Sequence, residues 1–159
     1  MPKGTGPSQS CSSKGEILPR VIIDTNVLLS GLFFKGNERK LLEHSLLGRV
    51  ELIVPEHVLL ETRNIIARKA GKMGNSEDAL AALDIIIGRA KIAKIAEYAG
   101  SLKKASGMIR DKKDAPILAA VLSLEHDYFV SGDKDFLELR LRTHIKTADL
   151  VRELELQNG

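Results

Sequence analysis

Four acidic residues stand where an α/β fold could bring their carboxylates together. Asp24 and Asp133 follow the short apolar runs Val21-Ile22-Ile23 and Tyr128-Phe129-Val130, which are typical of buried strands. Because ligands bind beyond the carboxyl ends of parallel strands, both carboxylates are expected at one edge of a sheet. Taken alone, each aspartate is more simply explained as a turn or helix-capping residue.

Helical patterns place the other two acids, Glu61 and Asp114. At 100° per residue, Glu61 lies about 40° from Ile65, at the margin of the apolar stripe of its helix. Its carboxylate is partly desolvated there, unless it pairs with Arg63 or Arg68. Asp114 stands at the start of an apolar helix with a proline in its first turn, so helix capping explains it well.

Capping does not explain why all four acids occur together. Carboxylates that gather closely repel one another, and their pKa values rise unless divalent cations neutralise them. Since oxygen ligands select hard ions, the four acids together predict a Mg²⁺ or Mn²⁺ site. The only cysteine, Cys11, excludes an internal disulfide and a cysteine-based metal site. The four histidines share no motif.

The elements that would position these acids alternate along the chain. Besides 21–23 and 128–130, strand patterns lie at 52–54 and, as a weaker fourth, at 143–146. Helices are predicted at 38–47, 56–69, 76–87, 96–104, 115–124 and 148–156, with a helix hairpin around the two glycines of 70–75. Strands separated by helices predict an α/β protein: a three-layer α/β/α sandwich with a central, mostly parallel sheet.

Composition predicts one domain after a disordered tail. Residues 1–19 are mostly Gly, Ser, Pro and Lys without apolar periodicity, whereas 20–159 can bury a single core. No apolar stretch approaches the roughly 20 residues of a membrane span, and no secretory signal is apparent, so we expect a soluble, cytoplasmic protein. The net charge of +3 permits nucleic-acid binding without demanding it. An aromatic content of 4% argues against stacked aromatic platforms for single strands.

Four motifs follow one another in the chain. They are Ile22-Ile23-Asp24-Thr25-Asn26-Val27-Leu28-Leu29-Ser30-Gly31, then Pro55, Val58, Glu61 and Ile65, then Asp114, Ile117, Ala119 and Ala120, and finally Ser131-Gly132-Asp133-Lys134-Asp135-Phe136. Their order and spacing over residues 20–154 resemble the PIN-domain family, whose members are mostly metal-dependent ribonucleases and include VapC-like toxins. The first motif is the most specific, because the second is mostly a helix with one glutamate.

The resemblance implies a role for each matching residue. The implied catalytic residues and ligands of Mg²⁺ or Mn²⁺ are Asp24, Glu61, Asp114 and Asp133. The implied supporting residues are Thr25, Asn26, Ser131, Asp111 and Asp135. Either Asp133 or Asp135 could face the metal, and we favour Asp133 because it is nearer the strand end.

The implied reaction is metal-assisted hydrolysis of phosphodiester bonds in single-stranded RNA, without attack by the 2′-hydroxyl. Basic residues beside the motifs are candidates for phosphate contacts, although exposed lysines and arginines are also ordinary solubility residues. They are Lys35, Arg39, Lys40, Arg63, Arg68, Arg110, Lys112, Lys113 and Lys134. The resemblance also implies a homodimer, and a role as a toxin would add a small antitoxin as partner.

Other functions compete with this interpretation. Haloacid-dehalogenase phosphatases attack phosphoryl groups with an aspartate that follows a strand, but they need a second acid where this chain has Asn26. A response-regulator receiver needs an acidic pair before its phospho-acceptor, which is absent around Asp24. The main alternative is a catalytically silent PIN-fold module that binds RNA or protein. Loss of acids would mark such a module, and all four acids are present.

Overall fold

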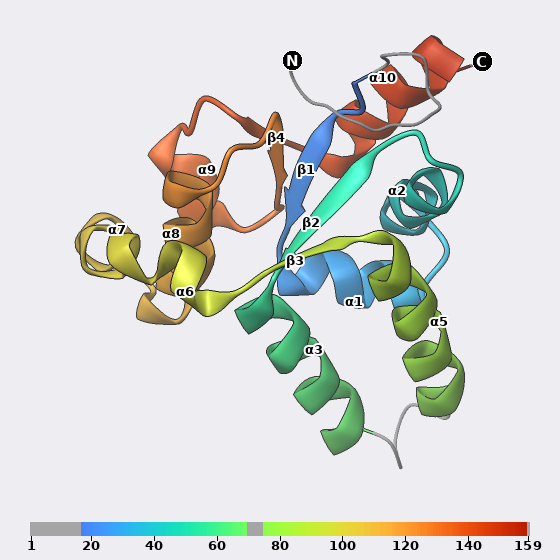
Figure 1. The fold of residues 1–159 in the computed structure, drawn as a ribbon, viewed down its shortest axis with the longest axis horizontal. Coiled ribbons are helices and arrows are strands. Elements are labelled where there is room, and N and C mark those ends of the chain that lie inside the picture. Colours follow the sequence, from blue (N-terminus) through green and yellow to red (C-terminus); the bar gives the residue numbers. More distant parts are fainter. Residues whose placement is uncertain (1–16, 70–74, 159) are drawn as a thin grey trace.

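Short runs of β-branched and aromatic residues form a parallel sheet. The computed structural model describes residues 17–69 and 75–158. Their strands are β1 (Arg20–Ile23), β2 (Glu51–Pro55), β3 (Lys91–Ala93), β4 (Tyr128–Val130) and β5 (His144–Ile145). All paired strands are parallel, in the order β3-β2-β1-β4-β5 (Figure 1). β1 is therefore central, and the strands that follow it lie on both of its sides.

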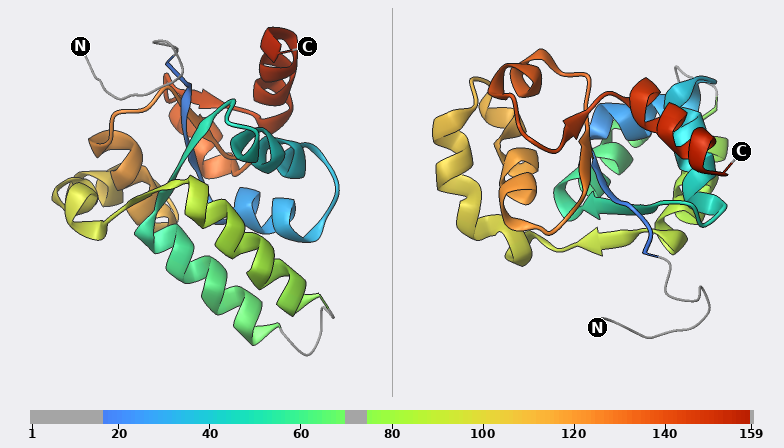
Figure 2. Two further views of the ribbon diagram at one scale, coloured as in Figure 1. Left: turned by 45° about the vertical axis from the view of Figure 1, so that its right-hand side comes forward. Right: turned by 90° about the horizontal axis from the view of Figure 1, so that it is seen from above.

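Helices cover both faces of this sheet. They are α1 (Thr25–Phe33), α2 (Asn37–Leu46), α3 (Glu56–Arg68), α5 (Ser76–Arg89), α6 (Ile95–Tyr98), α7 (Leu102–Met108), α8 (Ala115–Ser123), α9 (Lys134–Leu139) and α10 (Thr147–Asn158). Figure 2 shows α6 to α9 on one face and the remaining helices on the other, which confirms the predicted three-layer α/β/α sandwich. None of the helices in the described part of the chain is long and apolar enough to span a membrane.

The central strands are buried on both sides, as their uninterrupted apolar sequences predict. Val21, Ile22 and Ile23 have no exposed surface. On the neighbouring strand, Phe129 packs edge to face against Phe136 of α9, with ring centroids 4.9 Å apart and planes at 80°. This contact fixes α9 against β4 and so limits the path of the turn between them.

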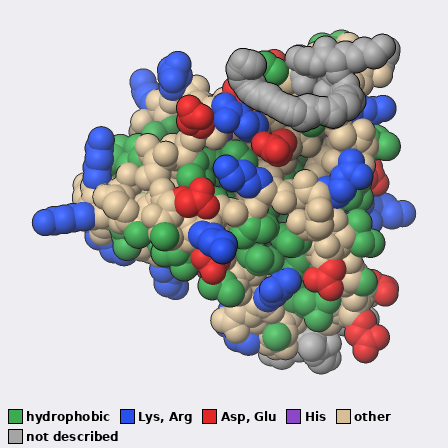
Figure 3. Space-filling model, viewed as in Figure 1, with side chains coloured by type: hydrophobic (Ala, Val, Ile, Leu, Met, Phe, Trp, Pro, Cys, Tyr) green, Lys and Arg blue, Asp and Glu red, His purple; other side chains and the backbone are tan. Residues whose placement is uncertain are grey.

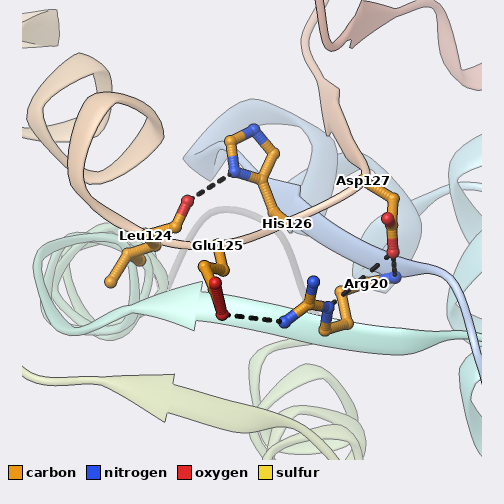
Figure 4. A network of polar contacts seen from close by, with 5 residues as sticks. All are labelled: Arg20, Leu124, Glu125, His126 and Asp127. Carbon is orange, nitrogen blue, oxygen red and sulfur yellow. Dashed lines mark hydrogen bonds and ion pairs between the residues drawn. The ribbon is translucent and has the colours of Figure 1, made fainter.

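Polar contacts fix the amino end of the sheet, opposite the edge where acids are predicted (Figure 4). The backbone N–H of Arg20 donates to Asp127 over 2.8 Å, and its guanidinium lies 3.8 Å from both Asp127 and Glu125. His126 contacts the carbonyl oxygen of Leu124 through Nδ1 at 2.7 Å. These contacts join the start of β1 to the loop between α8 and β4.

Most predicted elements are confirmed, and the differences have local causes. The helices predicted at 38–47, 56–69, 76–87, 115–124 and 148–156 are found within two residues of their expected ends. The continuous helix predicted at 96–104 is wrong, because α6 and α7 are separated by a 3₁₀ turn at Ala99–Ser101 that contains a glycine. The strand β3 and the helix α9 are present without having been predicted, and the helix α1 was implied only by the first family motif.

Two predictions fall largely outside the described residues. Of the tail predicted at 1–19, only Ile17–Pro19 is described, and it has neither helix nor strand. Of the hairpin predicted at 70–75, only Asn75 is described. The helices on either side, α3 and α5, lie antiparallel to each other (Figure 2).

Candidate metal and nuclease site

Strand register brings Asp24 and Ser131 together. Ile23 of β1 pairs with Val130 of β4, so the residues that follow them lie side by side at the carboxyl edge of the sheet. The Ser131 hydroxyl donates to Asp24 Oδ2 over 2.5 Å, and the Val27 N–H donates to Oδ1 over 2.8 Å. Asp24 thus caps α1, as one interpretation of the sequence had it, and it also faces β4.

Burial dominates the electrostatics of Asp24, whose exposed fraction is 4%. Burial raises the pKa of this carboxyl, the hydrogen bonds from Ser131 and Val27 oppose that rise, and the charge of Asp133 adds to it. His144 lowers the pKa of Asp24 by a smaller amount. The carboxylate therefore sits where a cation would be stabilising.

The turn after β4 is held from both sides. Ser131 Oγ accepts the Asp133 N–H at 3.1 Å, while the Ser131 carbonyl oxygen lies 2.7 Å from His144 Nε2 of β5. Asp133 in turn accepts the Asp135 N–H at 2.8 Å and caps α9. Both aspartates of this turn are therefore fixed in position. Asp133 caps α9, and Asp135 lies in the first turn of that helix.

Asp114 does not cap its helix, so the capping explanation for this residue is wrong. It occupies the position before α8, but its side chain makes no capping hydrogen bond. Its Oδ2 is buried and has no hydrogen-bond partner among the residues that the structure describes. Ligand atoms of Asp114, Asp111 and Asp135 all lie within 4.8 Å of one another.

The pKa of Asp114 rises to about 7. Burial is the largest cause, and the charges of Asp133, Asp111, Asp135 and Asp24 add to it in that order. Three of the four predicted ligands, Asp24, Asp114 and Asp133, thus share one electrostatic environment with both additional acids.

Glu61 reaches the site through Thr25. The Thr25 hydroxyl donates to Glu61 Oε1 over 2.5 Å, so the helix α3 is tied to the residue next to Asp24. Glu61 is half-buried, as its position on the margin of the apolar stripe predicts. Arg63, the pairing partner that the sequence allows for Glu61, instead lies 3.6 Å from Asp84 of α5. Glu61 is not part of the three-carboxylate group around Asp114.

The donor set fits a hard divalent cation. Its available ligand atoms are carboxylate oxygens, which Mg²⁺ and Mn²⁺ prefer. The buried Asp114 Oδ2 lacks a donor within the described residues, and a cation would supply the missing positive partner. Uncompensated negative charge at this place also adds to the raised pKa of Asp114, of which burial is the largest cause.

Several basic residues predicted to bind substrate already have partners. The Arg39 guanidinium donates to the carbonyl oxygens of Gly31 and Leu32, both at 3.0 Å, where it satisfies the end of α1. Arg110 donates to Asp135 over 3.0 Å, and Lys112 donates to the Ser106 carbonyl. Lys35 and Lys134 are exposed.

The surface charge is mixed rather than strongly basic. On the face seen in Figure 3, Lys and Arg side chains alternate with Asp and Glu, and the described residues form no continuous basic surface there. Any attraction for an RNA backbone must therefore come from a local group of cations, as the modest net charge predicts.

A groove of about 480 Å³ adjoins the acids. Polar residues that line it include Asn26, Ser30, Asn37, Ser131 and Lys146. Asn37, Lys146 and the nearby His144 were not among the predicted site residues. The rule that found Asp24 also finds Lys146: Val130 pairs with Ile145, so Ser131 and Lys146 are the next residues in register.

Comparison with known proteins gives a family and a fold. A family model described as PIN domain matches residues 20–135. The chain is similar to VapBC2 from Rickettsia felis, solved bound to a DNA fragment from their promoter, with 18% identity, a TM-score of 0.59, and coverage of 80% of this chain and 98% of that one. It is also similar to PAE2754 from Pyrobaculum aerophilum, with 15% identity, a TM-score of 0.63, and coverage of 91% and 94%. No curated protein matches it.

Proposed function

The chain belongs to the PIN-domain family, and from this premise we propose that it is a metal-dependent endoribonuclease that hydrolyses phosphodiester bonds of single-stranded RNA. One observation carries the proposal: a buried carboxylate oxygen of Asp114 has no donor among the described residues and faces further acids. Nothing but a cation would relieve that repulsion without protonating the site.

Each residue has a defined part in this proposal. Asp24, Glu61, Asp114 and Asp133 are the ligands, and Mg²⁺ or Mn²⁺ held by them would polarise the phosphate and activate water. Ser131 orients Asp24 through its hydroxyl, and this hydrogen bond opposes the rise that burial causes in the pKa of Asp24. Thr25, Asn26, Asp111 and Asp135 support the ligands or the substrate from the same edge of the sheet.

The test is cleavage of end-labelled single-stranded RNA in Mg²⁺, in Mn²⁺ and in EDTA. We expect cutting that requires the metal and that Asp24→Asn abolishes while its fold is retained. Glu153→Gln, a substitution of an exposed acid on α10, serves as the matched control and should cut like the parent. Equal cleavage by Asp24→Asn and the parent would refute the site.

Two further variants decide which acid of the turn faces the ion. Asp133→Asn removes one carboxylate while its amide oxygen can still cap α9, whereas Asp135→Asn removes a carboxylate that Arg110 contacts. We expect the larger loss of Mn²⁺ affinity from Asp133→Asn. A larger loss from Asp135→Asn would assign the metal to that residue instead.

The alternatives give other outcomes in the same assay. Binding of Mn²⁺ and RNA without cleavage of any RNA would favour the catalytically silent binding module. Hydrolysis of a small phosphate monoester, abolished by Asp24→Asn, would favour the phosphatase. The group of Asp111, Asp114 and Asp135 around the buried Asp114 oxygen supports a metal site, and the PIN-domain match supports the nuclease over both alternatives.

The same proposal extends to partners. VapBC2 shares this fold, which supports a role as the toxin of a toxin–antitoxin pair with a small antitoxin, and the family resemblance supports a homodimer. A groove of about 590 Å³ between α1, α2 and α5 exposes apolar side chains such as Phe33, Leu46 and Ile85, a feature of protein-binding surfaces. Co-purification with the product of a neighbouring short reading frame, and a stable dimer by light scattering, are the expected results.

A further inference from the structure

The groove beside Asp24 is built from four parts of the chain. It lies between the start of α1, the start of α2, the turn after β4 and the start of α10, and Leu137 of α9 also lines it. Ser131 lines it, and the Ser131 hydroxyl is 2.5 Å from Asp24. Gly132, next to Asp133, lines it too. A ligand in the groove therefore lies directly beside the acidic centre.

The lining of this groove combines apolar side chains, such as Val27 and Leu137, with polar ones. Asn26 and Asn37 offer amides that both donate and accept, Ser30 offers a hydroxyl, and Lys146 and Glu38 offer one charge of each sign. Asparagine amides match the paired donors and acceptors on the edges of nucleobases, and lysine binds phosphate. The volume of about 480 Å³ is within the range of small-ligand pockets.

Electrostatics indicate which way a substrate strand leaves the acids. On the α8 side, Asp111, Asp114 and Asp135 gather their carboxylates, and Arg110 is already bound to Asp135. On the groove side, Lys146 is exposed and makes no ion pair within the described residues. Until a cation neutralises them, the three carboxylates repel a phosphate next to the cleaved one, whereas Lys146 attracts it and Glu38 opposes part of that attraction.

The backbone at Gly132 leaves room for close approach. A Cβ added there would have no protein atom within 4 Å, so the turn presents its main chain to open space. Strand register explains why Lys146 faces the same region, because Ser131 and Lys146 follow the paired residues Val130 and Ile145. Among the residues that line the groove, Lys146 and Glu38 are the two charged ones, and the others are neutral.

We propose that this groove binds the nucleotide next to the cleaved phosphodiester, with Lys146 on its phosphate and Asn37 reading its base. The proposal rests on the proposed ribonuclease function and adds the origin of base preference to it. Unbound single-stranded RNA exposes the base edges that such contacts need, whereas bases paired within a duplex hide them.

The test measures kcat and KM on short RNAs in which each position beside the cut is varied in turn. Asn37→Ala should reduce the preference for the favoured base about tenfold at one position only. Lys146→Ala should raise KM several-fold for all sequences, and should lower the slope of log affinity against log salt by about 0.7. Mn²⁺ affinity should stay unchanged in both variants.

Matched controls lie on other surfaces. Asn64→Ala on α3 and Lys91→Ala on β3 remove an exposed amide and an exposed cation away from the groove, and should behave like the parent. The groove assignment would be overturned if Asn37→Ala kept its base preference and Lys146→Ala kept its KM. Metal-dependent cutting by the parent would still uphold the nuclease.

A binding assay keeps the inference testable if no RNA is cut. Fluorescence anisotropy of labelled single-stranded RNA in Ca²⁺, with the full chain, reports binding without cleavage. Weaker binding by Lys146→Ala than by Lys91→Ala would support the groove even if the nuclease proposal fails. Equal binding by these two variants would refute the role of the groove in RNA binding.

Discussion

Ser131 connects three strands at the acidic site. Its hydroxyl holds Asp24 at the end of β1, its carbonyl contacts His144 of β5, and it follows β4 directly. A hydrogen bond to a metal-binding carboxylate orients it and tunes its charge. Ser131→Ala leaves one oxygen of Asp24 without its donor, and should lower Mn²⁺ affinity and cleavage by about 10–100-fold.

Isothermal titration with Mn²⁺ and single-turnover cleavage would measure that loss. Ser123→Ala is the matched control, since the Ser123 hydroxyl is exposed and bonds only to Ser101 within the described residues. Affinity equal to that of the parent in Ser131→Ala would mean that Asp24 is positioned without this hydrogen bond.

The raised pKa of Asp114 makes the stability of the metal-free protein depend on pH. Its value of about 7 exceeds the ordinary 3.8, so the folded state binds a proton that the unfolded state has lost between these values. The free energy of unfolding therefore falls as pH rises from about 4 to 7. The pKa of Asp24 is also raised and acts in the same direction.

Asp114→Asn removes this dependence and should raise Tm above that of the parent at pH 8, in EDTA, with the difference closing below about pH 4. Thermal unfolding followed by circular dichroism across this pH range measures it. Two Tm curves that run parallel would show that the carboxyl is not perturbed in the folded protein.

Residue types alone could not reveal that the Asp114 side chain does not cap its helix. Its position before an apolar helix with a proline in the first turn is the usual position of a cap, yet the observed side chain makes no such bond. Asp24 and Asp133, by contrast, do cap helices and also lie at the site. Only the tertiary arrangement distinguishes a capping carboxylate from one that faces other acids.

At the scale of elements, the contact between α1 and α2 depends on Gly31. A Cβ at this position would lie 2.5 Å from Leu42 Cδ1 and 3.1 Å from the Glu38 carbonyl oxygen. Gly31→Ala should therefore destabilise the protein by about 1–3 kcal/mol despite the better helix propensity of alanine.

Gly88→Ala on α5 is the matched control, because a Cβ there would meet no atom within 4 Å. That substitution should stabilise the protein by about 0.4–1 kcal/mol. Urea unfolding of the two variants measures both changes. Stabilisation by Gly31→Ala would show that α2 moves away from α1 at little cost.

The elements that the sequence pattern missed are short. β3 spans three residues, Lys91–Ala93, with an exposed lysine, and it resembles a strand only once it pairs with Ile53 to Pro55 of β2. The predicted elements, such as 21–23 and 115–124, are mostly buried, so their apolar composition alone predicts them. Short elements such as β3 form because they pair with residues that are distant in sequence.

At the scale of the whole molecule, the strand order explains where the site lies. The chain adds β2 and β3 on one side of β1, then crosses to add β4 and β5 on the other. Parallel sheets bind ligands at such a switch point, and here Asp24 and Ser131 lie at it, directly after β1 and β4. The sequence could predict acids at strand ends, but the order of the strands, and with it Lys146 as a neighbour of Ser131, follows from tertiary structure.

This placement couples metal binding to the stability of the whole fold. The site joins the ends of β1 and β4 to α3, α8 and α9, and the unfolded chain cannot keep these acids together. Mn²⁺ at about 100 times its Kd should stabilise the folded state by about 2.7 kcal/mol and raise Tm by roughly 5–10 °C. Asp114→Asn should be more stable than the parent in EDTA and should lose most of this rise. A rise in Tm that persists in both Asp24→Asn and Asp114→Asn would place the stabilising ion elsewhere on the molecule.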